Sequence, residues 1–210
     1  AAEQYDIIII GGGPVGMALA LALHDTGISS FLLEARGLPE KIEDPRPLAL
    51  SHGSHLILHR LGIWNTLPQH TPITTIHISN RGSFGQTILT PEDAGVPTLG
   101  FVVNYHALFH AMHKKLTESK ANYIAGVAVT QLDTHENSGT AHLDYQGKET
   151  KVTAKLLVLA DGLQDLAERR MDDAVHHQQA AEHDGHYDVV HRHLVLQIDE
   201  AEQPAARHAL

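Results

Sequence analysis

Residues 5–16 of the chain read YDIIIIGGGPVG, and this stretch decides the fold. Its isoleucine run, residues 7–10, is β-branched and apolar, which is the pattern of a strand buried on both faces. The glycines that follow allow a tight turn, and an apolar helix begins directly after them. A strand, a glycine-rich turn and a helix in this order indicate a binding site for the phosphates of a dinucleotide.

Three glycines and one acidic residue have separate parts in this prediction. Gly11 would make the turn, Gly13 would let a phosphate approach, and Gly16 would let the helix pack closely on the sheet. The N-terminus of the helix offers free N–H groups and the positive end of its dipole to the anion. A second apolar strand ends at Glu34, about 20 residues further on, where a carboxylate can accept hydrogen bonds from ribose hydroxyls. The alternative is a glycine-rich turn that binds no ligand.

Composition excludes several other classes of function. The 210 residues are 42% hydrophobic, which is enough for one good-sized domain or for one domain and part of another. An aromatic content of 5% and a formal charge of −10 argue against nucleic acid as a partner. The absence of cysteine excludes disulfides, thiolate catalysis and Cys-ligated metals. No apolar run approaches the roughly 18 residues of a membrane span, and we expect a cytoplasmic location by default.

The periodicity of the remaining sequence predicts further elements around this strand–helix–strand unit. The predicted elements are a helix over 48–67 capped by Ser51 or Ser54, antiparallel strands over 73–79 and 84–89, an amphipathic helix over 105–119, a strand over 122–133, and a buried strand over 151–160. Histidines in the tail, at 176, 177, 183 and 186, have no apolar framework around them, so we expect no metal site there. The fold class is therefore α/β.

Several segments follow one another in an order that resembles one enzyme family. They are the glycine turn with Glu34-Ala35-Arg36, then DPRPLALS at 44–51, LHRLGIW at 58–64, LGFVV at 99–103 and LVLADG at 157–162. Together they resemble the group A flavoprotein aromatic hydroxylases, and they are most similar to the N-terminal half of UbiH-type FAD-dependent 2-polyprenyl-6-methoxyphenol hydroxylases of ubiquinone biosynthesis. The stretch from Arg46 to Trp64 is the most specific part of this resemblance.

The resemblance implies a set of FAD-binding residues. They are Gly11, Gly13, Pro14, Gly16, Glu34, Ala35, Arg36, Arg46, Val129, Ala160, Asp161 and Gly162. The glycine turn would hold the pyrophosphate, Glu34 would bind the adenosine ribose with Arg36 beside it, and Arg46 would lie near the flavin. Val129 would contact adenine through its backbone. The Ala160-Asp161-Gly162 segment matches a second FAD motif, which is also implicated in binding the nicotinamide cofactor.

The sequence departs from the family pattern downstream of that segment. Asp165 and Glu168 occupy positions where the family has serine and arginine, and two carboxylates there would repel a phosphate-bearing ligand. The family's third motif, Gly-Asp followed by Ala-His, does not occur in these residues. We therefore expect the N-terminal half of a longer protein, with an FAD-binding domain over 1–165, a hairpin excursion over 72–103, and a partial substrate domain or tail over 166–210.

The implied activity is an NAD(P)H-driven, FAD-dependent monooxygenation of a polyprenylated phenol. The cofactor supplies the difficult chemistry, so no catalytic residue is assigned. His52 and His55 either reach the mouth of the site or lie on a helix surface. The prenyl tail of such a substrate implies contact with the inner membrane surface or with a ubiquinone-biosynthesis complex. Two alternatives stay open: an NAD(P)-dependent oxidoreductase, and a non-catalytic dinucleotide-binding half-flavoprotein.

Overall fold

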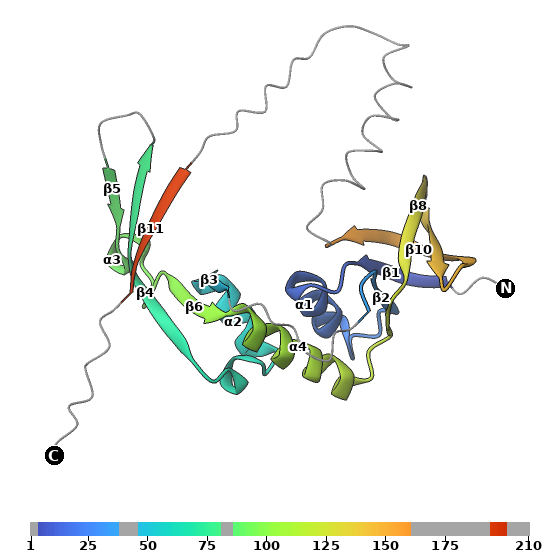
Figure 1. Ribbon diagram of the computed structural model, residues 1–210, viewed down its shortest axis with the longest axis horizontal. Helices are drawn as coiled ribbons and strands as arrows, with labels where there is room; N and C mark the ends of the chain where they lie inside the picture. Colours follow the sequence, from blue (N-terminus) through green and yellow to red (C-terminus); the bar gives the residue numbers. More distant parts are fainter. Residues whose placement is uncertain (1–3, 38–45, 81–85, 161–193, 201–210) are drawn as a thin grey trace, which may run out of the picture. The chain divides into compact units, whose positions relative to one another are not determined.

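The computed structural model describes residues 4–37, 46–80, 86–160 and 194–200, and Figure 1 labels most of their helices and strands. The described residues fall into two compact units. Unit 1 contains residues 4–37 and 109–160, and unit 2 contains 46–80, 86–108 and 194–200. The division falls within one helix, α4 (Tyr105–Ser119), and each unit has its own sheet.

Unit 1 is built on a six-stranded mixed sheet in which β7, β2, β1 and β10 are parallel neighbours. Its elements besides α4 are β1 (Gln4–Ile10), α1 (Pro14–Leu23), β2 (Ser30–Glu34), β7 (Tyr123–Ala125), β8 (Ala128–His135), β9 (Ser138–Tyr145) and β10 (Lys148–Leu159). The helix α1 contacts β1 and β2 and buries one face, which includes Met17, Ala20 and Leu21. The predicted Rossmann-like βαβ unit and the α/β fold class are thereby confirmed.

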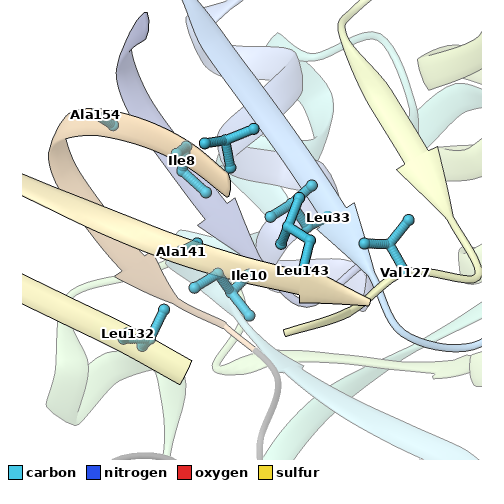
Figure 2. Packing of buried hydrophobic residues seen from close by; sticks show 9 residues of the cluster. Ile8, Ile10, Leu33, Val127, Leu132, Ala141, Leu143 and Ala154 are labelled. Carbon is cyan, nitrogen blue, oxygen red and sulfur yellow. The ribbon is translucent and has the colours of Figure 1, made fainter. Parts of the chain in front are cut away.

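The strand β10 belongs to two parts of this sheet at once. Residues 148–154 pair antiparallel with β9, which in turn pairs with β8, and residues 153–159 pair parallel with β1. The core of unit 1 contains buried residues from the parallel strands β1 and β2 and from this antiparallel meander. Figure 2 shows Ile10 and Leu33 from the parallel strands close to Ala141 and Leu143 of β9. These side chains join the two groups of strands by apolar burial.

Unit 2 is built on a five-stranded antiparallel sheet with the order β11-β4-β6-β3, in which β5 pairs with β4. Its elements are β3 (Pro47–Ser51), α2 (His52–Arg60), the 3-10 helix η1 (Trp64–Thr66), β4 (His70–Asn80), β5 (Gln86–Leu89), α3 (Pro91–Ala94), β6 (Gly100–Asn104) and β11 (Leu194–Glu200). The helix α2 contacts β3 and β6. The predicted antiparallel pairing within 73–89 is confirmed by β4 and β5.

Two predicted elements are corrected by pairings that are distant in sequence. The helix predicted over 48–67 is wrong at its start, because residues 47–51 form β3 and pair with β6. Helix α2 begins only after Ser51, whose side chain accepts a hydrogen bond from the Ser54 N–H at 3.2 Å. The strand predicted over 122–133 is two strands, because the backbone turns at Gly126, whose φ is +75°.

The remaining predictions concern the helix α4, the domain boundaries and membrane-spanning segments. The helix over 105–119 is confirmed, and its apolar stripe of Leu108, Met112 and Leu116 is buried. The domain boundaries at 165 and 166 lie outside the described residues and stay a prediction, as does the assignment of 72–103 as an excursion. None of the helices in the described part of the chain has the length and apolar character needed to cross a membrane.

The core of unit 1 generates a prediction about stability. Leu143 on β9 is 4% exposed within that core, so truncation in Leu143→Ala leaves a cavity and should cost about 2–5 kcal/mol of unfolding free energy. Urea unfolding followed by circular dichroism measures this loss. The matched control on the same strand is Tyr145→Ala, since Tyr145 is 41% exposed and should cost less than about 1 kcal/mol. Equal losses for the two variants would contradict this assignment of the core.

Candidate dinucleotide-binding site

The glycine turn joins β1 to α1 through a close backbone approach. Gly11 has a φ of +113°, a conformation that a residue with a side chain rarely adopts, and its N–H donates to the Leu33 carbonyl of β2 at 2.8 Å. A Cβ atom on Gly16 would collide with the Gly11 carbonyl oxygen and would lie 3.3 Å from Leu32 Cδ1. Gly11 and Gly16 therefore let the first turn of α1 approach the end of β1.

Gly13 faces open space at the start of α1. It is the N-cap residue of the helix, and a Cβ atom added to it would meet nothing within 4 Å. Because glycine has no side chain to cap the helix, the first N–H groups remain directed toward this space. Pro14, at the first helical position, has no N–H to leave unsatisfied. This end of the helix has the features that a phosphate-binding turn requires, which are N–H donors, a positive dipole end and room for the anion.

Glu34 ends β2 and links this turn to the chain beyond it. The residue is buried, with 7% of its surface exposed. One carboxylate oxygen, Oε2, accepts from the Gly12 N–H at 2.6 Å, and the other, Oε1, accepts from the backbone N–H of Arg36 at 2.9 Å and from its Nε at 3.0 Å. A Cβ atom on Gly12 would lie 2.8 Å from Glu34 Oε2 and Cβ. The second glycine of the turn is thus required by the carboxylate itself.

The charge state of Glu34 follows from these donors. Burial raises the pKa of the Glu34 carboxyl, but the hydrogen bonds from Arg36 and Gly12, with the Arg36 charge, outweigh it and hold that pKa below its usual value. A carboxyl whose pKa is lowered by folding stabilises the fold fully above its unfolded pKa of about 4.3. That contribution is lost as the pH falls through the lower folded pKa. Glu34 is therefore a carboxylate throughout the neutral range.

The three donors restrict how a ribose could bind. A carboxylate has about four acceptor positions, so the donors leave about one position for a ribose hydroxyl. A second hydroxyl would have to replace the Arg36 side chain, which is 71% exposed and can move into solvent. The sequence placed Glu34 at the end of this strand, but it did not indicate that Arg36 and Gly12 would bind it.

Residues between β7 and β8, which the sequence did not indicate, complete the same edge of the sheet. The Val127 N–H donates to the Glu34 carbonyl at 3.0 Å, and the Gly126 N–H donates to the Arg36 carbonyl at 3.2 Å. Tyr123 pairs with Leu32 across the sheet, and burial, followed by the Glu34 charge, raises the pKa of its hydroxyl to about 12. The glycine inside an apparent strand was the available signal for this turn.

The other residues of unit 1 that the sequence predicts as FAD contacts have different surroundings. The Ala160 N–H donates to the Ile10 carbonyl at 2.7 Å, so β10 ends beside the glycine turn. Ala35 is exposed between Glu34 and Arg36. Val129 pairs with Leu143 within the β8–β9 ladder, and its contact with adenine stays a prediction. Asp161, Gly162, Asp165, Glu168 and the tail histidines lie outside the described residues.

Arg46 belongs to unit 2, where it lies next to the start of α4. Its carbonyl accepts from the Tyr105 N–H at 3.0 Å, and its guanidinium lies over the Tyr105 ring at 5.4 Å from the centroid. Asn104 caps α4, because its Oδ1 accepts from the Ala107 N–H at 3.1 Å. The flavin contact assigned to Arg46 by resemblance stays a prediction.

Comparison with known proteins identifies the family to which this site belongs. Residues 4–205 match the family model described as FAD binding domain. The chain belongs to this FAD-binding domain family. The donors of the turn, the open space at Gly13 and the buried carboxylate of Glu34 fit the adenosine diphosphate part of FAD. The family resemblance and the FAD cofactor inferred from the sequence are confirmed.

Two relatives of this FAD-binding domain are named as hydroxylases of ubiquinone compounds. Ubiquinone hydroxylase UbiM of Neisseria meningitidis is 28% identical over 166 residues, which are 74% of the chain and 35% of the relative. The 3-demethoxyubiquinol 3-hydroxylase of Escherichia coli K12 is 26% identical over 185 residues, which are 86% of the chain and 47% of the relative. The chain thus spans less than half the length of these curated relatives.

A solved structure of a flavin-dependent monooxygenase supports the same fold. The complex of PieE with FAD and substrate superposes with a TM-score of 0.62 at 22% identity, covering 80% of the chain and 32% of PieE. At this identity the likeness concerns the fold alone. It supports the α/β FAD-binding fold that the sequence predicts.

The open space at Gly13 predicts a variant that separates cofactor binding from folding. In Gly13→Ala the new methyl group meets no protein atom within 4 Å but occupies the approach to the helix N-terminus. We expect FAD affinity to weaken by about tenfold or more while the thermal unfolding midpoint stays unchanged. Fluorescence titration with FAD and thermal unfolding measure the two quantities.

A second glycine provides the matched control for this variant. Gly53 lies within α2 of unit 2, where a Cβ atom would meet only Ser51 Oγ at 3.8 Å, so Gly53→Ala should leave FAD affinity unchanged. Unchanged affinity in Gly13→Ala would contradict the position assigned to the phosphates.

The donors around Glu34 predict the effect of neutralising it. In Glu34→Gln an amide group faces donors from Arg36 or Gly12, so one hydrogen bond is lost in a buried place, at a cost of about 1–3 kcal/mol of stability. FAD affinity should fall by about tenfold, since ribose loses a charged acceptor. Urea unfolding and FAD titration check both effects. Glu118→Gln, an exposed carboxylate on α4, is the control and should change neither.

Proposed function

We propose that the protein is an FAD-dependent, NAD(P)H-driven monooxygenase that hydroxylates the aromatic ring of a polyprenylated phenol in ubiquinone biosynthesis. The observation that carries this proposal is the glycine turn of unit 1 with its buried Glu34, found in a chain with two relatives that are named as hydroxylases of ubiquinone compounds. The glycine turn and Glu34 lie within the part of the chain that matches these relatives. The complete reaction is assigned to the whole protein.

The described residues would hold the adenosine end of the cofactor. The N–H groups at the start of α1 would bind the pyrophosphate, with Gly13 leaving room for it. Glu34 would accept from a ribose hydroxyl, and Tyr123 would remain a neutral hydroxyl beside that carboxylate. When bound, FAD supplies the redox chemistry that passes reducing equivalents from NAD(P)H to oxygen and places one oxygen atom on the ring.

The remaining site residues complete the proposal by resemblance. Arg46 would lie near the flavin, Val129 would contact adenine through its backbone, and Ala160, Asp161 and Gly162 would form the second FAD motif. For Ala160 the supporting observation is its hydrogen bond to Ile10, which brings the end of β10 beside the glycine turn. No residue is assigned to proton transfer.

The substrate class implies where the protein works. A polyprenylated phenol is largely apolar and partitions into lipid, so the enzyme would meet it at the inner membrane surface or through a ubiquinone-biosynthesis complex. The names of the two hydroxylase relatives support a ubiquinone precursor as the substrate. This contact is assigned to the whole protein.

A direct experiment tests the function in two steps. The purified chain is incubated with FAD, desalted and examined by absorbance, and a retained flavin spectrum is expected. NADPH and NADH oxidation is then followed with and without a prenylated phenol, with the hydroxylated product detected by mass spectrometry. Oxidation that requires the phenol and yields product supports the monooxygenase.

Other outcomes of the same experiment point to the alternatives. Flavin-free oxidation of a hydroxylated substrate with NAD(P)+ would favour an NAD(P)-dependent oxidoreductase. Retained flavin without any turnover, in this chain and in a longer one that includes the downstream region, would favour a non-catalytic flavoprotein.

A further inference from the structure

Unit 2 contains a cluster of aromatic rings centred on His55 of α2. The spacing of His52, His55 and His59 is i, i+3 and i+7, which places them on one face of the helix. The ring centroid of His55 lies 5.7 Å from that of His52 and 6.2 Å from that of His59. His55 therefore has one imidazole of the same helix on the turn before it and another on the turn after it.

Three other elements contribute rings to this cluster, which we name the His55 cluster. Trp64 of η1 lies edge-on to His55 at 4.4 Å, and Phe101 of β6 lies 4.8 Å from it. His70 of β4 stacks on Trp64 at 4.6 Å with an interplanar angle of 28°. Trp64 is 6% exposed, and His52 and His55 are half-buried, whereas His59 and His70 lie at the exposed edge.

The surroundings of His55 offer little support for a positive charge. The Nδ1 atoms of His52 and His55 are buried and have no hydrogen-bond partner among the described residues. The sequences of α2, η1, β3, β4 and β6 contain no Asp or Glu. The other titratable or charged groups of these elements are Arg60 at the end of α2 and His77 further along β4. Every charge that these elements can carry is positive.

The position of His55 opposes its protonation. Burial, followed by the charges of His52, His59 and His70, lowers the pKa of His55 below the usual value. Folding therefore disfavours the charged form of this imidazole.

We propose that the His55 cluster is a pH-sensitive element, in which the packing of rings from α2, β4 and β6 around Trp64 is stable while His55 is neutral and is weakened when the medium becomes mildly acidic. The direction follows from proton linkage. A histidine that is held neutral by folding binds fewer protons in the folded state, so stability is complete above its unfolded pKa of about 6.5. Stability then declines as the pH falls through that value.

The single tryptophan of the chain makes the test specific for this cluster. Trp64 fluorescence reports the unfolding of unit 2, and urea unfolding of the FAD-free chain is followed with it at pH values from 8 to 5. For each proton taken up on unfolding, the unfolding equilibrium constant rises by about tenfold when the pH falls by one unit. Below about pH 6.5 we expect the unfolding equilibrium constant to rise as the pH falls, because the unfolded state binds the proton that folded His55 disfavours.

Substitutions assign this slope to His55. His55→Phe keeps an aromatic ring in the cluster and removes the titrating group, so the slope should fall by up to one proton. His135→Gln is the control, because His135 is an exposed histidine on β8 of unit 1, and its slope should equal that of the unsubstituted chain. If His55→Phe does not fold, His55→Gln replaces it, and the same reduction is expected.

Two results would overturn the proposal. A slope near zero in the unsubstituted chain would show that unfolding takes up no proton in this range. An equal slope in the unsubstituted chain and in the His55 variant would assign the protons to other groups, such as the half-buried His113 of α4, whose pKa is also lowered by burial and by His110.

Discussion

The structure of unit 1 depends on the close approach of α1 to the end of β1. Side chains larger than hydrogen are excluded at Gly16 by the Gly11 carbonyl and at Gly12 by the Glu34 carboxylate. This contact fixes the direction in which the helix N-terminus points, and it brings Glu34 of the next strand into hydrogen-bond range of the turn. Packing therefore requires glycine at positions 12 and 16, whereas Gly13 is free of packing constraints and leaves the helix N-terminus open.

Elements held by contacts between residues close in sequence were predictable, whereas elements held by distant pairings were not. The βαβ unit was predictable because the strand, the turn and the helix are adjacent in sequence and each has its own composition. The start of the predicted helix over 48–67 was wrong because β3 owes its existence to β6, which lies some fifty residues away. The apolar residues of β3 satisfied a helical pattern equally well, so only the pairing decides between the two.

In the candidate site, too, the residues set by local spacing were predictable and the contacts between distant strands were not. The identity of Gly11, Gly16 and Glu34 was readable from spacing. The binding of Glu34 by Gly12 and Arg36, and the approach of Val127 from the β7–β8 turn, depend on how separate strands meet at one edge of the sheet. Arg46 illustrates the remaining difficulty, because its sequence motif predicts a ligand contact, whereas its described contacts are with Tyr105 in unit 2.

The double pairing of β10 has a consequence for how this chain can change in length. Thr153 and Ala154 pair with β9 on one side and with β1 on the other, so one strand sets the register of both ladders. An insertion or deletion of a single residue there would invert the inward and outward faces of one ladder relative to the other. Length variation among homologous sequences should therefore be absent from this strand and should collect in turns such as the one between β8 and β9.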